Sequence, residues 1–286
     1  MVTKAASPTV LRRQLGAELR RMRERARRTV TDVAHELGWS ESKLSRVETA
    51  HSGIRQADLQ RLCEFYGAEE SERKRLSALA DQARQRGWWE AYGDALPSAY
   101  ETYIGFEAEA SAIFTYEAQV VPGLLQSDEY ASVVTIADGV VPDRGVIERR
   151  VAVRMARQVI LTRDPPPRLW AILDEAVLRR PIGGEDVMRR QLLRLLEASE
   201  RETITIQVLP FAVGAHRALA GSFIILEFGD DTNAPLVYSE GLTGGTFRSK
   251  PDELRSYWMS FEALRTVALD PERSYEFIEK LAHRQS

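Results

Sequence analysis

A short segment near the N-terminus, residues 40–48, carries polar side chains at a spacing suited to hydrogen bonding with nucleobases. In a helix, residues one turn apart lie on the same face. An arginine on such a face can donate two parallel hydrogen bonds to guanine, and a glutamate can accept one from the amino group of cytosine. We therefore predict that this face reads bases through Glu41, Ser42, Ser45 and Arg46.

Neighbouring side chains are better suited to the DNA backbone, because hydroxyl and cationic groups bind phosphate oxygens. Two structural alternatives stay open: Arg46 could form a salt bridge with Glu48, and Lys43 could simply be exposed. Glu48 itself is predicted to pack back and fix the helix. The predicted phosphate contacts are Thr31, Ser40, Lys43 and Arg55.

Two short helices, joined by Gly38-Trp39-Ser40, position these side chains. Thr29 can cap the first helix, with Asp32 at the capping-box position. Gly38 ends that helix, as glycine does after a last helical turn, and Ser40 caps the second. The predicted shared core is Val33, Leu37, Leu44 and Val47.

The surrounding sequence predicts an all-α domain over residues 8–86, with five short amphipathic helices that bury their apolar stripes against one another. Residues 1–86 hold 18 Lys and Arg against 12 Asp and Glu, a net charge of +6. Residues 87–286 hold 21 against 30, a net of −9. A basic end on an acidic chain is typical of a protein that presents one face to a polyanion, although solvated arginines alone could produce it.

The segment T-V-T-D-V-A-H-E-L-G-W-S-E-S-K-L-S-R-V-E at 29–48 resembles the phage-repressor type (XRE-type) helix-turn-helix domain. Leu-Gly, Ser and Leu-Ser-Arg-Val-Glu stand at the family's offsets, and the helical run from Val10 to Arg86 has the family's length. One departure is Thr49-Ala50, where the family commonly has a glycine just after the glutamate. The resemblance implies double-stranded DNA as partner and, since operators are commonly palindromic, a homodimer.

Residues 87–99 begin with Gly87-Trp88-Trp89 and lack helical periodicity, so we predict a connection between domains there. Residues 100–286 then mix helical and alternating patterns. Tyr103, Phe106, Ala110 and Ile113 are spaced as in one helix, and short apolar runs near 169–173, 203–209, 222–228, 236–239 and 246–249 read as strands. We expect an α+β domain with a small, largely antiparallel sheet.

Residues 100–286 are similar to a C-terminal domain that follows this kind of helix-turn-helix in many regulators of high-GC Gram-positive bacteria. The matching segments are P-G-L-L-Q-S-D-E-Y at 122–130, R-x-x-R-Q at 154–158, D-E-A-V-L-R-R at 174–180 and Q-V-L-P-F at 207–211. That domain has no settled biochemical function. The resemblance implies a sensor or partner-binding domain, with a small acidic protein encoded nearby as a candidate partner.

Candidate contacts in this second domain are Leu124, Leu125, Tyr130, Arg154 and Arg157. The two leucines could form a docking ridge, although a core position is the stronger interpretation. The two arginines could hold an anionic ligand, although a solvated, salt-bridged helix face is the stronger interpretation.

Catalysis is not expected, because no nucleophile elbow, phosphate loop or metal-ligand spacing is present. Glu175, His216 and Glu240 could be imagined around a cleft, but they match no catalytic motif. The single cysteine, Cys63, excludes an intramolecular disulfide and a cysteine-based zinc cluster. No metal and no cofactor are expected. No apolar run approaches the ~18 residues of a membrane span, and the N-terminus lacks a signal-peptide core, so a cytoplasmic protein is predicted.

We therefore predict a DNA-binding transcriptional regulator whose C-terminal domain senses a ligand or binds a small partner protein. The alternative is the DNA-binding member of a two-gene, toxin–antitoxin-like module with a transferase-like C-terminal domain.

Overall fold

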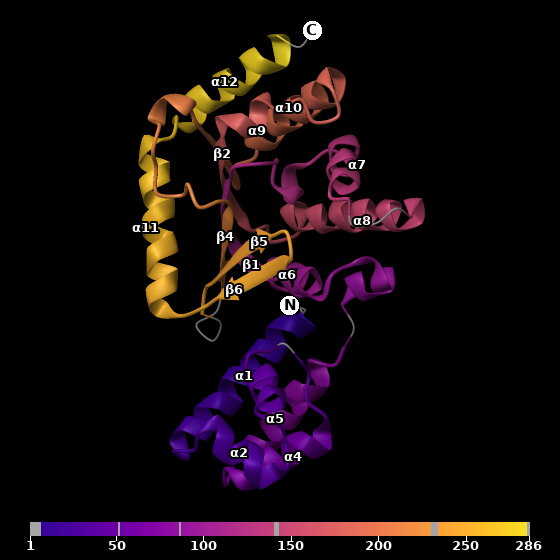
Figure 1. The fold of residues 1–286 in the computed structure, drawn as a ribbon, viewed down its shortest axis with the longest axis vertical. Coiled ribbons are helices and arrows are strands. Elements are labelled where there is room, and N and C mark those ends of the chain that lie inside the picture. The colour runs from indigo at the N-terminus through magenta and orange to yellow at the C-terminus, as the bar shows by residue number, and fades with distance from the viewer. Residues whose placement is uncertain (1–6, 51, 86, 140–142, 230–233, 285–286) are drawn as a thin grey trace. The chain divides into compact units, whose positions relative to one another are not determined.

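The computed structural model describes residues 7–50, 52–85, 87–139, 143–229 and 234–284 (Figure 1). Arg86 and Ser286, at which the two predicted domains end, lie outside these ranges. The chain divides into two compact units, Met1–Ala91 and Tyr92–Ser286, and the division falls within the predicted connection at 87–99. Each unit is described by itself.

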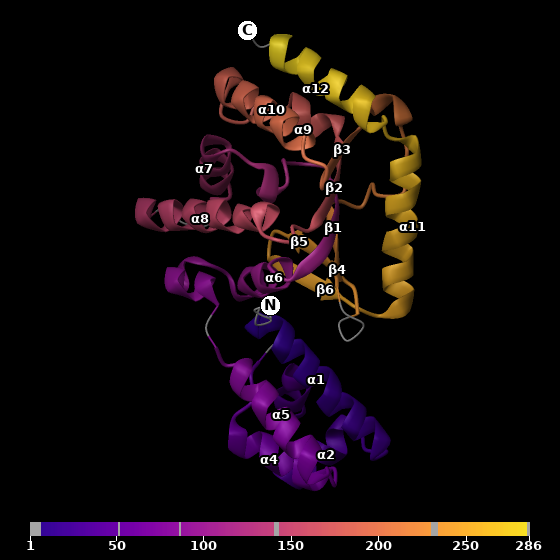
Figure 2. The same ribbon diagram turned by 180° about the vertical axis from the view of Figure 1, so that it is seen from behind.

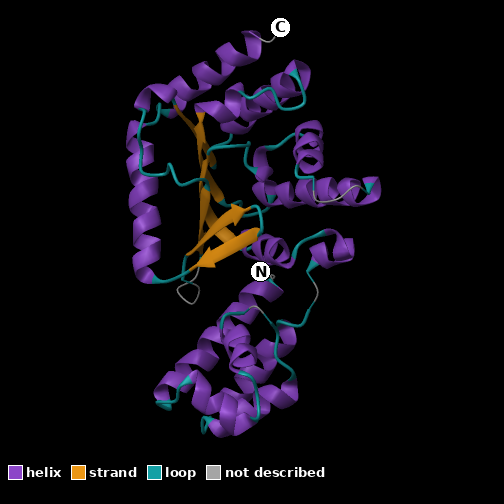
Figure 3. Cartoon of the chain, viewed as in Figure 1, coloured by secondary structure: helices purple, strands orange, loops and turns teal. Residues whose placement is uncertain are grey.

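The first unit is helical throughout its regular structure (Figure 3). Its main helices are α1 (Pro8–Arg25), α2 (Val30–Leu37), α3 (Glu41–Glu48), α4 (Gln56–Phe65) and α5 (Glu70–Gln82), and the 3₁₀ segment η1 (Trp88–Ala95) follows. Leucines of α1, α3, α4 and α5 meet in one core, whose fully buried members include Leu19, Leu44, Leu62 and Leu76.

Local signals in the sequence fix the turn between α2 and α3. Thr29 and Asp32 form a reciprocal capping box at the start of α2. Gly38 has a φ of 65°, in the left-handed region that glycine adopts without steric cost. Ser40 then accepts a hydrogen bond from the backbone of Lys43 and caps α3. These caps satisfy backbone donors that a short helix would otherwise leave unpaired.

Gly16 allows α1 to approach the end of α3 closely. A Cβ at this position would come within 2.7 Å of the carbonyl oxygens of Val47 and Glu48. A larger residue would therefore push the two helices apart.

The second unit is built around one six-stranded sheet with the order β3-β2-β1-β4-β5-β6. Strand β1 pairs with β2 in parallel, and β2 pairs with β3 in parallel; β4, β5 and β6 continue the sheet antiparallel from the other side of β1. The strands are β1 (Ala110–Glu117), β2 (Arg168–Asp174), β3 (Ile204–Leu209), β4 (Phe223–Phe228), β5 (Leu236–Gly241) and β6 (Gly244–Arg248).

Helices cover both faces of this sheet (Figures 1 and 2). Helix α11 covers one face, where Phe261 and Leu264 pack against Tyr116, Phe223 and Ile225. The opposite face carries α6, α7 and α8, and α10 and α12 pack beside β3. The helices are α6 (Ser98–Glu107), α7 (Asp128–Ala137), α8 (Arg144–Arg157), α9 (Glu175–Arg179), α10 (Glu185–Ser199), α11 (Pro251–Val267) and α12 (Pro271–Arg284).

The prediction of a small, largely antiparallel sheet is wrong: the sheet is mixed and has six strands. The single helix predicted across residues 103–113 is the source of the error, because α6 ends at Glu107 and β1 begins at Ala110. Helices cover both faces of β1, so its sequence lacks the alternation of a half-exposed strand. Without β1, its parallel ladder with β2 and its antiparallel ladder with β4 could not be anticipated.

Candidate nucleic-acid interface and pocket

Helix α3 presents the predicted base-reading side chains on one exposed face. Its opposite face is buried, with exposed fractions of 0% for Leu44 and 4% for Val47. Because the helix is capped and anchored along this apolar side, its outer face is held in a fixed orientation. The exposed side chains on that face are Glu41, Ser42, Ser45 and Arg46.

Glu48 is bonded to Arg23 of α1 and not to Arg46. Its two carboxylate oxygens accept hydrogen bonds from Nε and Nη2 of Arg23 at 2.7 and 2.8 Å. Both side chains are largely buried, with 5% of Glu48 and 11% of Arg23 exposed. A bidentate pair of this kind fixes the C-terminal end of α3 against α1, which is the structural role predicted for Glu48, and it leaves Arg46 exposed.

The predicted phosphate contacts differ in how their side chains are engaged. Thr31, Ser40 and Arg55 are exposed at the beginnings of α2, α3 and α4. Lys43 is half-buried: its Nζ donates to Asp58 at 2.9 Å and lies 3.9 Å from the centre of the Trp39 ring. Phosphate would have to compete with Asp58 for this lysine. Arg55 forms no ion pair within the described part of the chain, so phosphate would meet no such competition there.

The turn after α3 keeps a glycine-type conformation although it has no glycine. Thr49 is the C-cap residue, and Ala50 has a φ of 62°, in the left-handed region that favours glycine. The departure noted at Thr49-Ala50 therefore changes the residue type while the backbone still makes a left-handed turn, at a steric cost on the order of 1 kcal/mol.

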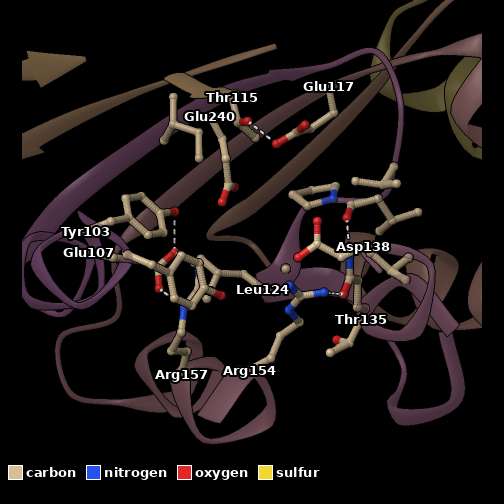
Figure 4. A pocket seen from close by; sticks show the side chains of 18 of the residues that line it. Tyr103, Glu107, Thr115, Glu117, Leu124, Thr135, Asp138, Arg154, Arg157 and Glu240 are labelled. Carbon is tan, nitrogen blue, oxygen red and sulfur yellow. Dashed lines mark hydrogen bonds and ion pairs between the residues drawn. The ribbon is translucent and has the colours of Figure 1, made fainter. Parts of the chain in front are cut away.

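In the second unit, a pocket of about 530 Å³ lies on the sheet face that carries α6, α7 and α8 (Figure 4). Strands β1, β4 and β5 supply Thr115, Glu117, Ile224, Tyr238 and Glu240. Figure 4 shows Glu117 and Glu240 on the sheet side and Arg154 and Arg157 on the side of α8. This volume is within the ~300–1,000 Å³ typical of sites for small molecules.

Arg157, one of the candidate ligand contacts, forms a buried ion pair with Glu107. The two side chains join through two hydrogen bonds of 2.7 and 2.6 Å, and only 4% and 1% of them are exposed. The hydroxyl of Tyr100 contacts the same guanidinium, and the hydroxyl of Tyr103 donates to Glu107 at 2.5 Å. Because Glu107 already neutralises its guanidinium, Arg157 is not available as a free anion-binding group.

Arg154 is the more available of the two predicted arginines. One of its Nη atoms donates to Gln126 at 3.0 Å, and the side chain is half-buried beside Glu240. One turn earlier on α8, Arg150 pairs with Asp138 at 3.6 Å.

Two carboxylates of the pocket had little support from the sequence: Glu240 was considered only for a cleft with Glu175 and His216, and Glu117 was not singled out. Burial raises the pKa of Glu117 to about 7, and hydrogen bonds from Thr115 and Ser222 offset only part of this effect. Partial burial also raises the pKa of Glu240, and the positive charges of Arg154 and Arg157 oppose that shift. The sequence signal was weak, because each glutamate stands near the end of an apolar strand where a solvent-exposed residue is equally common.

The remaining candidate contacts are buried. Exposed fractions are 3% for Leu124, 1% for Leu125 and 0% for Tyr130. The leucines therefore belong to the core and do not form an exposed docking ridge, although Leu124 also lines the pocket. Tyr130 accepts a hydrogen bond from the backbone of Val121 and so fixes the loop before Leu124.

The structure does not bring Glu175, His216 and Glu240 together around the pocket. Glu240 lines it, but Glu175 bonds Arg179 and the backbone of Phe211, and His216 lies near Tyr116. Among the described residues, no cluster of three His, Cys, Asp or Glu side chains is placed as metal ligands would be. In the same part of the chain, no helix combines the length and the apolar character needed to cross a membrane.

A Glu117→Gln variant is expected to stabilise the protein at pH 8 and to change its stability little at pH 5. The folded state raises the pKa of this carboxyl, so between pH 4.5 and 7 it binds more protons than the unfolded state. Stability therefore falls as the pH rises through this window, by at most about 3 kcal/mol at full ionisation. Denaturant unfolding of both proteins at the two pH values measures the difference. An equal effect of the substitution at pH 5 and pH 8 would contradict the raised pKa.

Comparison with known families identifies both units. The model of a family described as a domain of unknown function, DUF5753, matches residues 100–280, and a helix-turn-helix domain model matches residues 14–76. No curated protein and no solved structure matches the chain. The helix-turn-helix match contains α2 and α3 with the exposed face described above, and domains of this kind bind DNA.

Proposed function

Since the chain belongs to the DUF5753 family and carries a helix-turn-helix domain, we propose that it is a sequence-specific transcriptional regulator of the XRE type, whose second unit senses a ligand. The observation that carries this proposal is the exposed face of α3, with Arg46 and Glu41 at positions that can bond base edges. The net charge of +6 on residues 1–86 supports binding to a polyanion. The pocket on the sheet supports ligand sensing.

Fluorescence-anisotropy binding across a salt series tests the proposal. The full chain is titrated with DNA from upstream of its own gene and with a scrambled duplex of the same composition. A specific regulator is expected to bind its site about 10³-fold or more tightly than the scrambled DNA at physiological salt. Equal, weak binding to both duplexes would mean that the first unit binds DNA only through its positive charge, and it would contradict the proposal.

Dimerisation, a small acidic partner and the absence of catalysis stay predictions.

Substitutions of Arg55 and Lys43 are expected to have unequal effects on the salt dependence of DNA binding. Arg55→Ala should remove one phosphate contact, weaken binding to every sequence alike, and reduce the slope of log K against log salt by about 0.9. Lys43→Ala should change the slope less, because Asp58 already neutralises that lysine. The same salt series measures both slopes, and a larger change for Lys43→Ala would show that DNA displaces Asp58.

A further inference from the structure

Helix α3 carries two cationic side chains, and the structure holds them differently. Arg46 is exposed and forms no ion pair in the described part of the chain. Lys43, one turn earlier, is held from two sides: its Nζ donates to Oδ2 of Asp58 at 2.9 Å and lies 3.9 Å from the centre of the Trp39 ring. Only 37% of the Lys43 side chain and 20% of the Asp58 side chain are exposed. One of the two cations of α3 is therefore bound to the protein itself.

The carboxylate that binds Lys43 comes from outside the two-helix motif. Asp58 lies in the first turn of α4, three residues after Arg55. Arg55 is exposed and has no ion pair among the described residues, so the beginning of α4 presents an available cation next to a carboxylate. Like charges repel, so Asp58 opposes a phosphate by its own charge and also engages a lysine that could attract one.

Folding of the first unit does not depend on this ion pair. Helix α4 is anchored by Leu59 and Leu62, which are 2% and 0% exposed and pack in the same core as Leu44 of α3. An ion pair between partly exposed side chains contributes little to stability. We therefore expect an Asp58→Asn variant, which keeps the size of the side chain, to fold as the wild type does.

We propose that Asp58 limits the DNA affinity of the first unit by holding Lys43 away from the phosphate backbone. Asp58 is then a positioning residue, because it acts through Lys43 and does not touch DNA. This proposal rests on the proposed DNA-binding function and adds to it a carboxylate that weakens binding. Since phosphate contacts carry no sequence information, the restraint weakens binding to DNA of any sequence.

Fluorescence-anisotropy titrations of the full chain across a salt series test this inference, with the upstream DNA and the scrambled duplex. The Asp58→Asn variant frees Lys43 for one further phosphate contact. The slope of log K against log salt should therefore steepen by up to about 0.9. At about 0.15 M salt, a slope change of this size corresponds to binding that is about 3- to 5-fold tighter for both duplexes.

A double variant separates this role from the loss of a negative charge. In a Lys43→Ala background, Asp58→Asn should change the affinity by less than about 2-fold, because the side chain through which Asp58 acts is absent. Glu70→Gln is the matched control: Glu70 pairs with Lys74 at 3.5 Å on α5, outside the two-helix motif, so its substitution should leave the slope as in the wild type. Thermal melting establishes that each variant is folded.

Three results would overturn the inference. Asp58→Asn could leave the slope and the affinity unchanged, which would mean that Lys43 reaches no phosphate. It could tighten binding equally with and without Lys43, which would mean that Asp58 acts only through its own charge. Lys43→Ala alone could reduce the slope by about 0.9, which would mean that DNA already displaces Asp58 in the wild type.

Failure of this inference is distinguishable from failure of the proposed function. Selective binding of the wild type, with no effect of Asp58→Asn, would leave the proposed regulator standing and remove the restraint. Equal binding of the wild type to both duplexes would contradict the proposed regulator, and the effect of Asp58→Asn would still be measurable on the scrambled DNA.

Discussion

An Arg157→Met variant is expected to lose about 3–5 kcal/mol of unfolding free energy, because the substitution leaves the Glu107 carboxylate buried without its counter-charge. In the native protein, 4% of Arg157 and 1% of Glu107 are exposed, and two hydrogen bonds join them. Among the described residues, the Tyr103 hydroxyl would still donate a hydrogen bond to that carboxylate. Denaturant unfolding of the full chain, followed by far-UV circular dichroism and by tryptophan fluorescence, measures the loss; Trp170 and Trp258 report on the second unit, and Trp39, Trp88 and Trp89 on the first.

Two comparison variants separate the buried pair from a general loss of charge. Arg144→Gln removes an arginine from the same helix that is 93% exposed and whose partner, Glu148, is 68% exposed, so its cost should be within ~1 kcal/mol. The double variant Glu107→Leu with Arg157→Met should recover most of the stability, since no lone charge then remains in the interior. A loss below 1 kcal/mol for Arg157→Met would mean that the pair contributes no more than a surface ion pair.

An Arg46→Ala variant is expected to bind the specific DNA site about 5- to 150-fold more weakly, which corresponds to ~1–3 kcal/mol. The loss should fall on the specific site and spare scrambled DNA, because a bidentate contact to guanine carries sequence information and a phosphate contact does not. The slope of log K against log salt should change little. Anisotropy titrations with both duplexes measure the affinity ratio.

Two substitutions serve as references for this result. Arg46→Lys keeps the charge and loses the planar fork, so it should recover only part of the specific binding. Lys74→Ala removes a positive charge from α5, outside the two-helix motif, and should leave the specificity ratio unchanged. If Arg46→Ala weakens binding to both duplexes equally, Arg46 contacts the backbone and another residue of α3 reads the bases.

The turn between α2 and α3 was predictable because its determinants are local. Thr29, Asp32, Gly38 and Ser40 each act within four residues along the chain, and the structure shows the caps and the left-handed turn that their types indicate. The partner of Glu48 was not predictable, because Arg23 is 25 residues away and many arginines of α1 would have served equally well.

The pocket was beyond sequence reasoning for the same physical reason. Arg154 and Arg157 were found by their residue type. The ion pair of Arg157 with Glu107 was not, because it joins α8 to α6 across 50 residues of the chain. Glu117 gained its unusual environment from β1, a strand whose apolar spacing continued that of the preceding helix.

The position of β1 in the sheet also sets an order of events during synthesis. Its antiparallel partner β4 lies far along the chain: Thr115 bonds the backbone of Phe223 across 108 residues. At ~5–20 residues per second, the ribosome needs roughly 5–20 s to cover that distance. Helices α1 to α5, which include α3 and its packing partners, are synthesised before this interval begins. Throughout the interval, the edge of β1 that will pair with β4 has no partner strand. A growing chain therefore acquires its DNA-binding unit first, and the wall that carries Glu240 is among the last parts of the sheet to form.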